Sequence, residues 1–255
     1  MKLRVLLLGV TGRIGKNFVN DYFTHGYDKE YELIVGLRNE NKFGDDRFEK
    51  RHADLSNIDS LKKAFERVDV VLNLAANSNP MEENFDNLLG PNLVGTYNLF
   101  EAARIAKVKR VITASSVHAI KGYHEDKIVK EFDSPRPENL YGATKAFVEA
   151  MCHVYYKKYN LSCIAIRIGA YVSDDLLEKV CFTRDNYDYV ISQRDMAQLF
   201  HKSIIAPMTL KYAILSGSSD NKKKRLDLEA TKKIIGYAPE DDSYKMCENV
   251  KGMGK

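Results

Sequence analysis

Residues 3–15 read LRVLLLGVTGRIG, an apolar run followed by three glycines in a GxxGxxG pattern, and an amphipathic segment comes next. A strand, a glycine turn and a helix in this order let the backbone approach a pyrophosphate, whose charge the helix N-terminus stabilises. The alternative is a purely structural turn. The stretch predicts a dinucleotide-binding fold, with these residues at the cofactor: Gly9, Thr11, Gly12, Arg13, Ile14 and Gly15.

The alternation of short apolar runs with longer amphipathic segments continues along most of the chain. It predicts an α/β fold, a Rossmann-type doubly wound parallel sheet covered on both faces. Strands are expected at 3–9, 31–37, 48–53, 68–74, 110–115, 161–168 and 212–216. Helices are expected near 14–23, 60–68, 93–106, 141–159, 194–205 and 226–235.

Two segments, 118–139 and 171–192, escape this alternation. Irregular segments of α/β domains often form a ligand rim beyond the carboxyl ends of the strands, although a variable surface loop is the alternative. We therefore expect a single NAD(P)-binding domain over 1–255, with a small substrate-binding portion from about 170–192 and 217–255.

Composition and charge narrow the function classes. The 255 residues suit one core, and 39 basic against 35 acidic side chains give a net charge of +4, which makes no electrostatic case for nucleic acid or a membrane surface. The basic run 222–225 is expected to be a solvated face. Four cysteines without a CxxC pair and six histidines without ligand spacing predict neither a metal site nor a disulfide framework. A cytoplasmic protein with reduced thiols and a small-molecule substrate fits best.

The end of the second expected strand bears on the choice of cofactor. An acid usually holds the ribose there, but Gly36-Leu37-Arg38-Asn39 supplies a guanidinium, which favours a 2′-phosphate and therefore NADP over NAD. The alternative is a solvated Arg38, with Glu40 at the ribose. After the third strand, Asp54 and Leu55 are expected beside the adenine, unless Asp54 caps the helix that follows.

Tyr141 and Lys145 stand four residues apart, which places a phenol and an ammonium on one helix face. The spacing alone is weak evidence, since Tyr123 and Lys127 share it, but Tyr141 opens a long helix whereas Tyr123 lies in an irregular loop. A neighbouring lysine and an oxidised nicotinamide both favour phenolate, so Tyr141 is a usable base. Ser116, at the end of the fifth strand, would bind the same substrate oxygen, unless it only satisfies a strand terminus.

These motifs together resemble extended short-chain dehydrogenase/reductases, the NAD-dependent epimerase/dehydratase superfamily. The resemblance covers nearly the whole chain. Within the superfamily, the chain looks most like uronate dehydrogenases and related aldose 1-dehydrogenases, which oxidise the anomeric carbon of a sugar to a lactone. Besides the glycine turn, the matching segments are Asn73-Leu74-Ala75-Ala76, Asn92 to Thr96, Ser115 to His118, Pro135 to Lys145, Arg167-Ile168-Gly169 and Gly236 to Pro239.

The resemblance implies Ser116, Tyr141 and Lys145 as the catalytic set. It adds Asn73, Ala75 and Ala76 to the expected cofactor contacts. At the substrate it implies Ser78, Ser116, His118 and the strand end from Arg167 to Ala170. His118 either orients a sugar hydroxyl or packs within its loop.

Some positions depart from the pattern of uronate dehydrogenases. Val117 stands where they usually have Asn, and Ala170 where they usually have Ser. Their carboxylate-binding arginine falls at or beside Asp185, with Arg184 one residue away. A one-residue loop shift would let Arg184 restore the carboxylate contact; otherwise a neutral or differently charged substrate is expected.

Three hypotheses follow. The leading one is an NAD(P)-dependent oxidoreductase that transfers hydride between nicotinamide and a sugar, a uronate or another small alcohol or carbonyl compound. The second is a nucleotide-sugar epimerase or dehydratase with retained NAD, although Val117-His118 replaces the acid pair usual in dehydratases. The third is a non-catalytic NADP-binding regulator. A homodimer through the helices near 93–106 and 141–159 is common among relatives, and the sequence neither requires nor excludes it.

Overall fold

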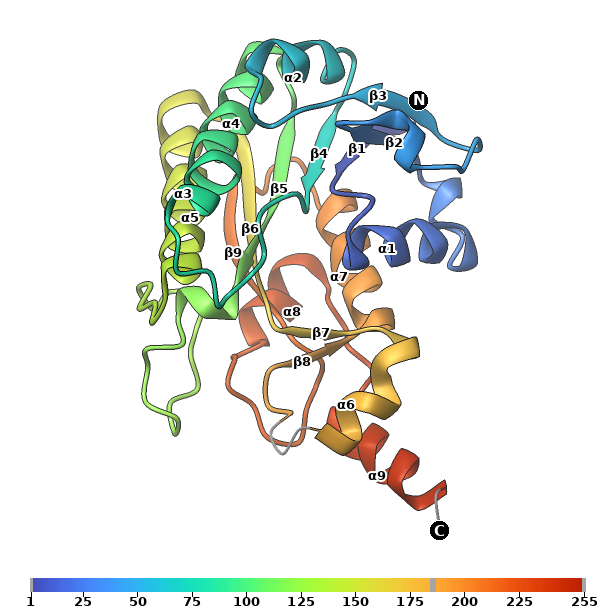
Figure 1. Cartoon of the computed structure of the whole chain (residues 1–255), viewed down its shortest axis with the longest axis vertical. Helices are drawn as coiled ribbons and strands as arrows, with labels where there is room; N and C mark the ends of the chain where they lie inside the picture. Colours follow the sequence, from blue (N-terminus) through green and yellow to red (C-terminus); the bar gives the residue numbers. More distant parts are fainter. Residues whose placement is uncertain (1, 184–186, 254–255) are drawn as a thin grey trace.

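The computed structural model describes residues 2–183 and 187–253, and its centre is a seven-stranded parallel sheet in the order β3-β2-β1-β4-β5-β6-β9 (Figure 1). The strand order reverses between β1 and β4, where a doubly wound sheet opens its ligand crevice. This confirms the Rossmann-type α/β prediction. The strands are β1 (Leu3–Leu8), β2 (Tyr31–Leu37), β3 (Glu49–His52), β4 (Val70–Asn73), β5 (Arg110–Ser116), β6 (Ser162–Ile168) and β9 (Tyr212–Gly217).

Helices cover both faces of this sheet (Figure 1). One layer contains α2 (Ile58–Ala64), α3 (Asp86–Leu88), the π-helical segment Leu89–Val94, α4 (Gly95–Ile105) and α5 (Leu140–Tyr159). The other contains α1 (Arg13–Thr24), α7 (Gln193–Ile205) and α8 (Glu229–Ile235). Short 3-10 turns are Tyr27–Lys29, Glu40–Lys42, Val117–Ala119 and Asp174–Leu176.

Strand β1 shows why the sequence runs are apolar without a break. Val5 and Leu7 pack in the core that includes Phe18 of α1, whereas Leu6 and Leu8 pack on the opposite face. Because successive side chains of a strand point to opposite faces and both faces are covered, all four residues from Val5 to Leu8 are buried. The core therefore forms two layers separated by the sheet.

A second, two-stranded parallel sheet lies beyond the carboxyl ends of the large one (Figure 1). It consists of β7 (Ala170–Val172) and β8 (Val190–Ser192), accompanied by α6 (Leu177–Thr183) and α9 (Ser243–Met253). The expectation of an irregular segment over 171–192 is therefore wrong in part. Each strand has three residues, too few for a periodic pattern, and pairing of distant segments decides the structure here.

A disulfide joins Cys181 of α6 to Cys247 of α9. The prediction of reduced thiols without a disulfide is thus wrong for this pair, while Cys152 and Cys163 are free and buried. The two bonded cysteines are 66 residues apart, and they meet only because α6 and α9 pack together. Cysteine spacing along the chain carries no signal for such a tertiary contact.

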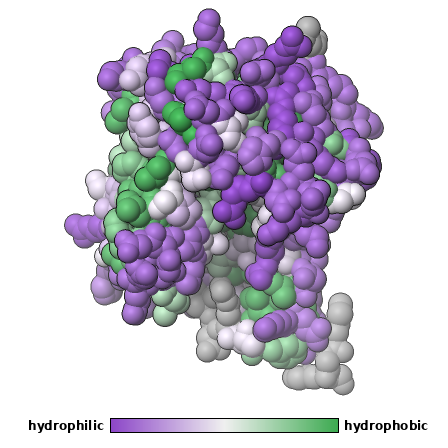
Figure 2. Space-filling view, turned by 45° about the horizontal axis from the view of Figure 1, so that its top comes forward, coloured by the Kyte–Doolittle hydropathy of each residue, from purple (hydrophilic) through white to green (hydrophobic). Residues whose placement is uncertain are grey.

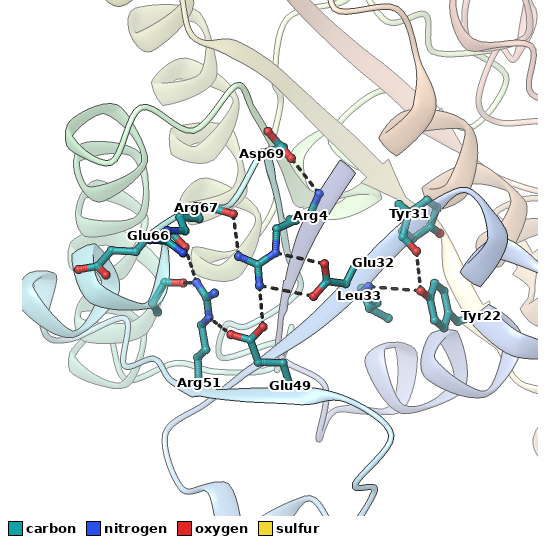
Figure 3. A network of polar contacts seen from close by, with 11 residues as sticks. Arg4, Tyr22, Tyr31, Glu32, Leu33, Glu49, Arg51, Glu66, Arg67 and Asp69 are labelled. Carbon is teal, nitrogen blue, oxygen red and sulfur yellow. Dashed lines mark hydrogen bonds and ion pairs between the residues drawn. The ribbon is translucent and has the colours of Figure 1, made fainter. Parts of the chain in front are cut away.

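Ion pairs join the strands at the amino-terminal edge of the sheet (Figure 3). Arg4 of β1 binds Glu32 of β2 at 3.2 Å and Glu49 of β3 at 2.6 Å, and Arg51 of β3 binds two main-chain carbonyls near the end of α2. A surface cavity opens beside these residues, but both guanidinium groups are already paired within the protein. These contacts of Arg4 and Arg51 hold the strands in register at their amino-terminal ends, opposite the glycine turn.

The basic run 222–225 is only partly the solvated face that we expected. Lys222 to Lys224 are exposed, but Arg225 is buried against the ring of Tyr189 and donates to the Tyr123 carbonyl. The charge pattern of the run itself does not reveal that Arg225 packs against Tyr189. Across 2–183 and 187–253, no helix has both the length and the apolar character needed to span a membrane.

Candidate active site

The glycine turn is tightly packed against the loop that follows β4. Gly9 has a φ of +87°, and a Cβ there would lie 2.7 Å from the Ala75 nitrogen. A Cβ on Gly15 would lie 2.4 Å from the Gly9 oxygen. Only glycine fits both positions: Gly9 brings the loop after β1 against the backbone of Leu74 and Ala75, and Gly15 brings the start of α1 against the backbone of Gly9.

The N-terminus of α1 suits an anion. Gly12 is its N-cap, no described side chain caps it, and its first turn carries no acidic residue. Thr11, Gly12 and Arg13 are exposed there, and Ile14 is half-buried. The unpaired backbone N–H groups and the helix dipole fit a pyrophosphate.

Asp54 lies beyond the end of β3, within reach of the charge of Arg38. Burial opposes ionisation of Asp54, but two hydrogen bonds from Ser56 and the charge of Arg38 leave the pKa of this carboxyl lowered. The N-cap of α2 is Asn57, which accepts from the backbone of Asp59 and Ser60, so the alternative in which Asp54 caps this helix is wrong.

The side chain of Asn73 shapes the turn after β4. Its amide oxygen accepts from the Ala75 nitrogen at 3.2 Å, and its amide nitrogen lies 3.5 Å from the Thr113 hydroxyl. The carbonyl of Leu55 accepts from Asn98 at 2.8 Å. The Asn73 side chain and the Leu55 carbonyl bond other groups of the protein, so they fix the shape of the loops after β4 and β3.

Tyr141, Ser116 and Lys145 come together where β5 ends and α5 begins. Tyr141 is 8% exposed; its burial raises the pKa of the phenol, and a hydrogen bond with Ser116 only partly offsets this. Lys145 lies one turn further and donates to the Ala114 carbonyl at 2.9 Å, with its Nζ 5.5 Å from the centre of the Tyr141 ring. Burial lowers the pKa of Lys145 to about 8.

We expected a neighbouring lysine and an oxidised nicotinamide both to favour the phenolate; in the protein alone, the lysine does not outweigh the effect of burial on the phenol. Desolvation penalises both charged forms, because each group is buried between α5 and the end of β5. In the protein alone, Tyr141 is therefore a neutral phenol at neutral pH. Lys145, with a pKa of about 8, is still mostly charged at neutral pH, so further positive charge beside the phenol, as expected from an oxidised nicotinamide, is needed to shift it toward phenolate.

His118 lies beside this pair. Its backbone nitrogen donates to the Ser116 hydroxyl at 3.2 Å, and its ring stands edge-on to that of Tyr141, with centroids 5.6 Å apart. Burial, followed by the charge of Lys121, lowers the pKa of His118 to about 4. Its Nδ1 contacts Asn139 of the same region at 3.0 Å. His118 is thus a neutral side chain packed at the site.

A buried ion pair lies directly behind the site, and sequence reasoning missed its acid. Glu149 is 3% exposed and accepts two hydrogen bonds, each 2.9 Å, from Arg167, which is 1% exposed. Ser115 donates to the same carboxylate at 2.7 Å. The expectation that Arg167 flanks the substrate is therefore wrong. The signal was present, since Tyr141, Lys145 and Glu149 recur every four residues on one helix face.

Asn92 is a second residue whose role the sequence did not reveal. It is buried in the π-helical segment, where it bonds both the nitrogen and the oxygen of the Asn77 backbone and donates to Thr144 at 3.0 Å. Thr144 precedes Lys145 in α5. Asn92 therefore joins the loop after β4 to the helix that carries the tyrosine and lysine.

The remaining expected substrate residues are more scattered. Ser78 is exposed in the loop after β4, and Ala170 begins β7, where its nitrogen donates to the Tyr189 carbonyl. Arg184 lies outside the described residues. The second tyrosine and lysine match is structural, because the Tyr123 hydroxyl donates to the Ser134 carbonyl and the Lys127 ammonium lies over the Tyr123 ring.

Comparison with known proteins agrees with this architecture. The model of the NAD dependent epimerase/dehydratase family matches residues 5–179. A uronate dehydrogenase of Pseudomonas syringae pv. tomato is 29% identical, over 94% of this chain and 82% of the relative. An L-arabinose 1-dehydrogenase (NAD(P)(+)) of Haloferax volcanii is 31% identical, over 76% and 83%. A solved mutated uronate dehydrogenase superimposes with a TM-score of 0.81 at 25% identity, over 99% of this chain and 86% of that one. These findings confirm the resemblance seen in the sequence.

Proposed function

The chain belongs to the NAD-dependent epimerase/dehydratase family, and on that premise we propose that it is an NAD(P)-dependent oxidoreductase acting on a sugar, a uronate or another small alcohol or carbonyl compound. One observation carries the proposal. Tyr141 and Ser116 are hydrogen-bonded, and Lys145 lies one helical turn away. All three lie at the carboxyl ends of the central strands, where the glycine turn meets the loop after β4.

The catalytic chemistry divides between cofactor and chain. When bound, NAD(P) supplies the hydride acceptor or donor. Ser116 and Tyr141 hold the substrate oxygen between two hydroxyls, and Tyr141 takes its proton in oxidation or returns it in reduction. Lys145, held against the Ala114 carbonyl and mostly charged at neutral pH with a pKa of about 8, favours the ionised phenol.

A substrate panel tests this function. Purified protein is assayed at 340 nm with uronates, neutral aldoses and small ketones, each with NAD and NADP in the matching redox state. We expect turnover coupled to net formation or use of NAD(P)H. If the protein retains NAD and converts a nucleotide sugar without net formation of NADH, it is an epimerase or dehydratase instead. If it binds the cofactor tightly but turns over no substrate, it is a regulator.

The family is NAD-dependent. We propose that this chain nevertheless prefers NADP, because Arg38 is exposed at the end of β2. A guanidinium binds a 2′-phosphate through charge-assisted hydrogen bonds, so Arg38→Ser should weaken NADP binding by roughly 10- to 100-fold. NAD binding should stay within about twofold, because NAD lacks that phosphate. Fluorescence titration of both cofactors measures the two dissociation constants.

Lys42→Ser removes one positive charge from the neighbouring turn and serves as the matched control. It should weaken NADP binding far less than Arg38→Ser does. Equal loss of NAD and NADP in the Arg38 variant would contradict the assignment. A selective loss of NAD in Glu40→Gln would instead support a ribose contact by that carboxylate.

We propose that the two-stranded sheet, α6, α9 and the chain over 217–255 form the substrate-binding portion of a single domain. A small core supports this, since Val172, Cys181, Val190 and Cys247 are buried together beyond the carboxyl ends of the large sheet. The proposed roles of Ser78, His118, Ala170 and Arg184 belong to this side of the site. Their contacts with substrate are part of the same proposal.

We also propose that the protein is a homodimer through the helical layer of α4 and α5. Figure 2 shows apolar side chains gathered on that flank of the molecule. Sedimentation velocity should give twice the chain mass, because exposed apolar patches of this kind mark association surfaces; a monomer at micromolar concentration would contradict it. The exposed large apolar residues of the π-helical segment, α4 and α5 are Leu89, Val94, Tyr97, Ile105, Leu140, Val154 and Tyr159.

A further inference from the structure

The side chain of Asn139 is bonded at both ends. It is the N-cap of α5, and its amide oxygen accepts a hydrogen bond from the Gly142 backbone nitrogen at 2.7 Å. Its amide nitrogen lies 3.0 Å from Nδ1 of His118. One side chain therefore connects the start of the helix carrying Tyr141 with the histidine beside Tyr141.

These two contacts determine the protonation of the histidine ring. A backbone N–H only donates, so the oxygen of the Asn139 amide must face Gly142 and its nitrogen must face His118. An amide nitrogen also only donates, so Nδ1 of His118 must be the bare, accepting nitrogen. The proton of the neutral ring is then on Nε2.

We propose that Asn139 is a positioning residue that holds His118 as the Nε2–H tautomer and so places a neutral N–H donor beside Tyr141. The role of that donor toward a substrate oxygen rests on the function proposed above. The tautomer itself does not, because it follows from contacts within the protein.

Three contacts fix the backbone and ring of His118 beside Tyr141. The His118 backbone nitrogen donates to the Ser116 hydroxyl, and the His118 ring stands edge-on to Tyr141. A Cβ on Gly142 would lie 2.2 Å from the His118 carbonyl oxygen, so the first turn of α5 packs directly on the histidine backbone. The Asn139 amide therefore meets a ring whose backbone is already fixed.

The surroundings also keep the ring neutral. Burial and then the charge of Lys121 lower the pKa of His118 to about 4. Its other titratable neighbour, Tyr141, is a neutral phenol with a raised pKa. At neutral pH the ring therefore stays unprotonated on Nδ1.

Long-range proton–nitrogen NMR of the 15N-labelled protein tests the tautomer without any turnover. Comparison with His118→Gln assigns the His118 signals among the six histidines. We expect an unprotonated Nδ1 and a protonated Nε2 in the unmodified chain. A protonated Nδ1 would overturn the proposal.

Two substitutions test the role of Asn139 while preserving the helix start, because Asn, Asp and Ser are all good N-caps. Asn139→Asp presents a carboxylate to Nδ1, so the proton should move to Nδ1 or the ring should become charged, with a raised pKa. We expect kcat/KM to fall about tenfold, because the ring either loses its Nε2–H donor or gains a charge beside Tyr141, and a charged ring would add a new ionisation to the pH profile. Asn139→Ser is too short to reach the ring, so it should give mixed tautomers and a smaller loss.

An unchanged His118 spectrum in both variants would overturn the positioning role. A changed tautomer with unchanged kcat/KM and pH profile would also overturn it, because the N–H donor would then be irrelevant to the reaction. Failure of the proposed function is a separate result, since it shows as a silent substrate panel while the NMR signature remains readable.

Discussion

Tyr141→Phe should lower kcat by about 10²- to 10⁴-fold, the usual contribution of a positioned acid or base. The phenylalanine fills the same buried space, so the cofactor dissociation constant should stay nearly unchanged. Stopped-flow or steady-state assays at 340 nm, with the best substrate of the panel, measure the loss. Oxidation should also lose its rise with pH, because burial raises the pKa of Tyr141 and the base form is populated only as pH increases.

The chain supplies a matched control for this variant. Tyr123 has the same four-residue spacing to a lysine, but its hydroxyl donates to the Ser134 carbonyl within a loop. Tyr123→Phe should therefore retain nearly full activity. Equal activity of the Tyr141 and Tyr123 variants would remove Tyr141 from its role and refute the proposed mechanism.

Arg167→Met should lower the free energy of unfolding by about 3–5 kcal/mol, the usual cost of leaving one member of a buried ion pair unpaired. Glu149 would keep the Ser115 hydroxyl but lose both hydrogen bonds from the guanidinium. The carbonyls of Lys130 and Asp133, which also bind Arg167, would lose their donors. Urea unfolding at pH 7, followed by circular dichroism, measures the change.

The double variant Arg167→Met/Glu149→Gln separates charge burial from lost packing. Because neither of the two positions then carries a charge, it should be more stable than Arg167→Met alone. A single variant that loses less than about 1 kcal/mol would show that the pair behaves like an exposed one. Equal stability of the single and double variants would show that the unpaired carboxylate is not what destabilises the protein.

The main sheet could be predicted because most of its strands are covered on both faces. Except for β3, which reads EKRH, each has an apolar run that differs from the amphipathic helices, and the expected strand at 31–37 coincides with β2. The small sheet, α6 and α9 could not be predicted in the same way, because their stability depends on packing against one another. The disulfide was missed for the same reason.

In the candidate site, too, local motifs could be predicted and contacts between distant segments could not. Ser116, Tyr141 and Lys145 were expected together, and the structure brings them to one place because the end of β5 lies under the start of α5. Arg167 was misassigned, because its partner Glu149 lies on a different element and their pairing was not visible in the local sequence. Asn92 was missed because its partners lie in two other segments.

The sequence by itself determined the order of the strands and helices of the main sheet, the glycine turn and the phenol–ammonium pair, because each depends on the pattern within one continuous segment. Only the tertiary structure decided the cysteine pairing, the position of Arg167, the raised pKa of Tyr141 and the tautomer of His118. Those properties depend on desolvation and on hydrogen-bond partners, which are fixed only when distant segments of the chain come into contact.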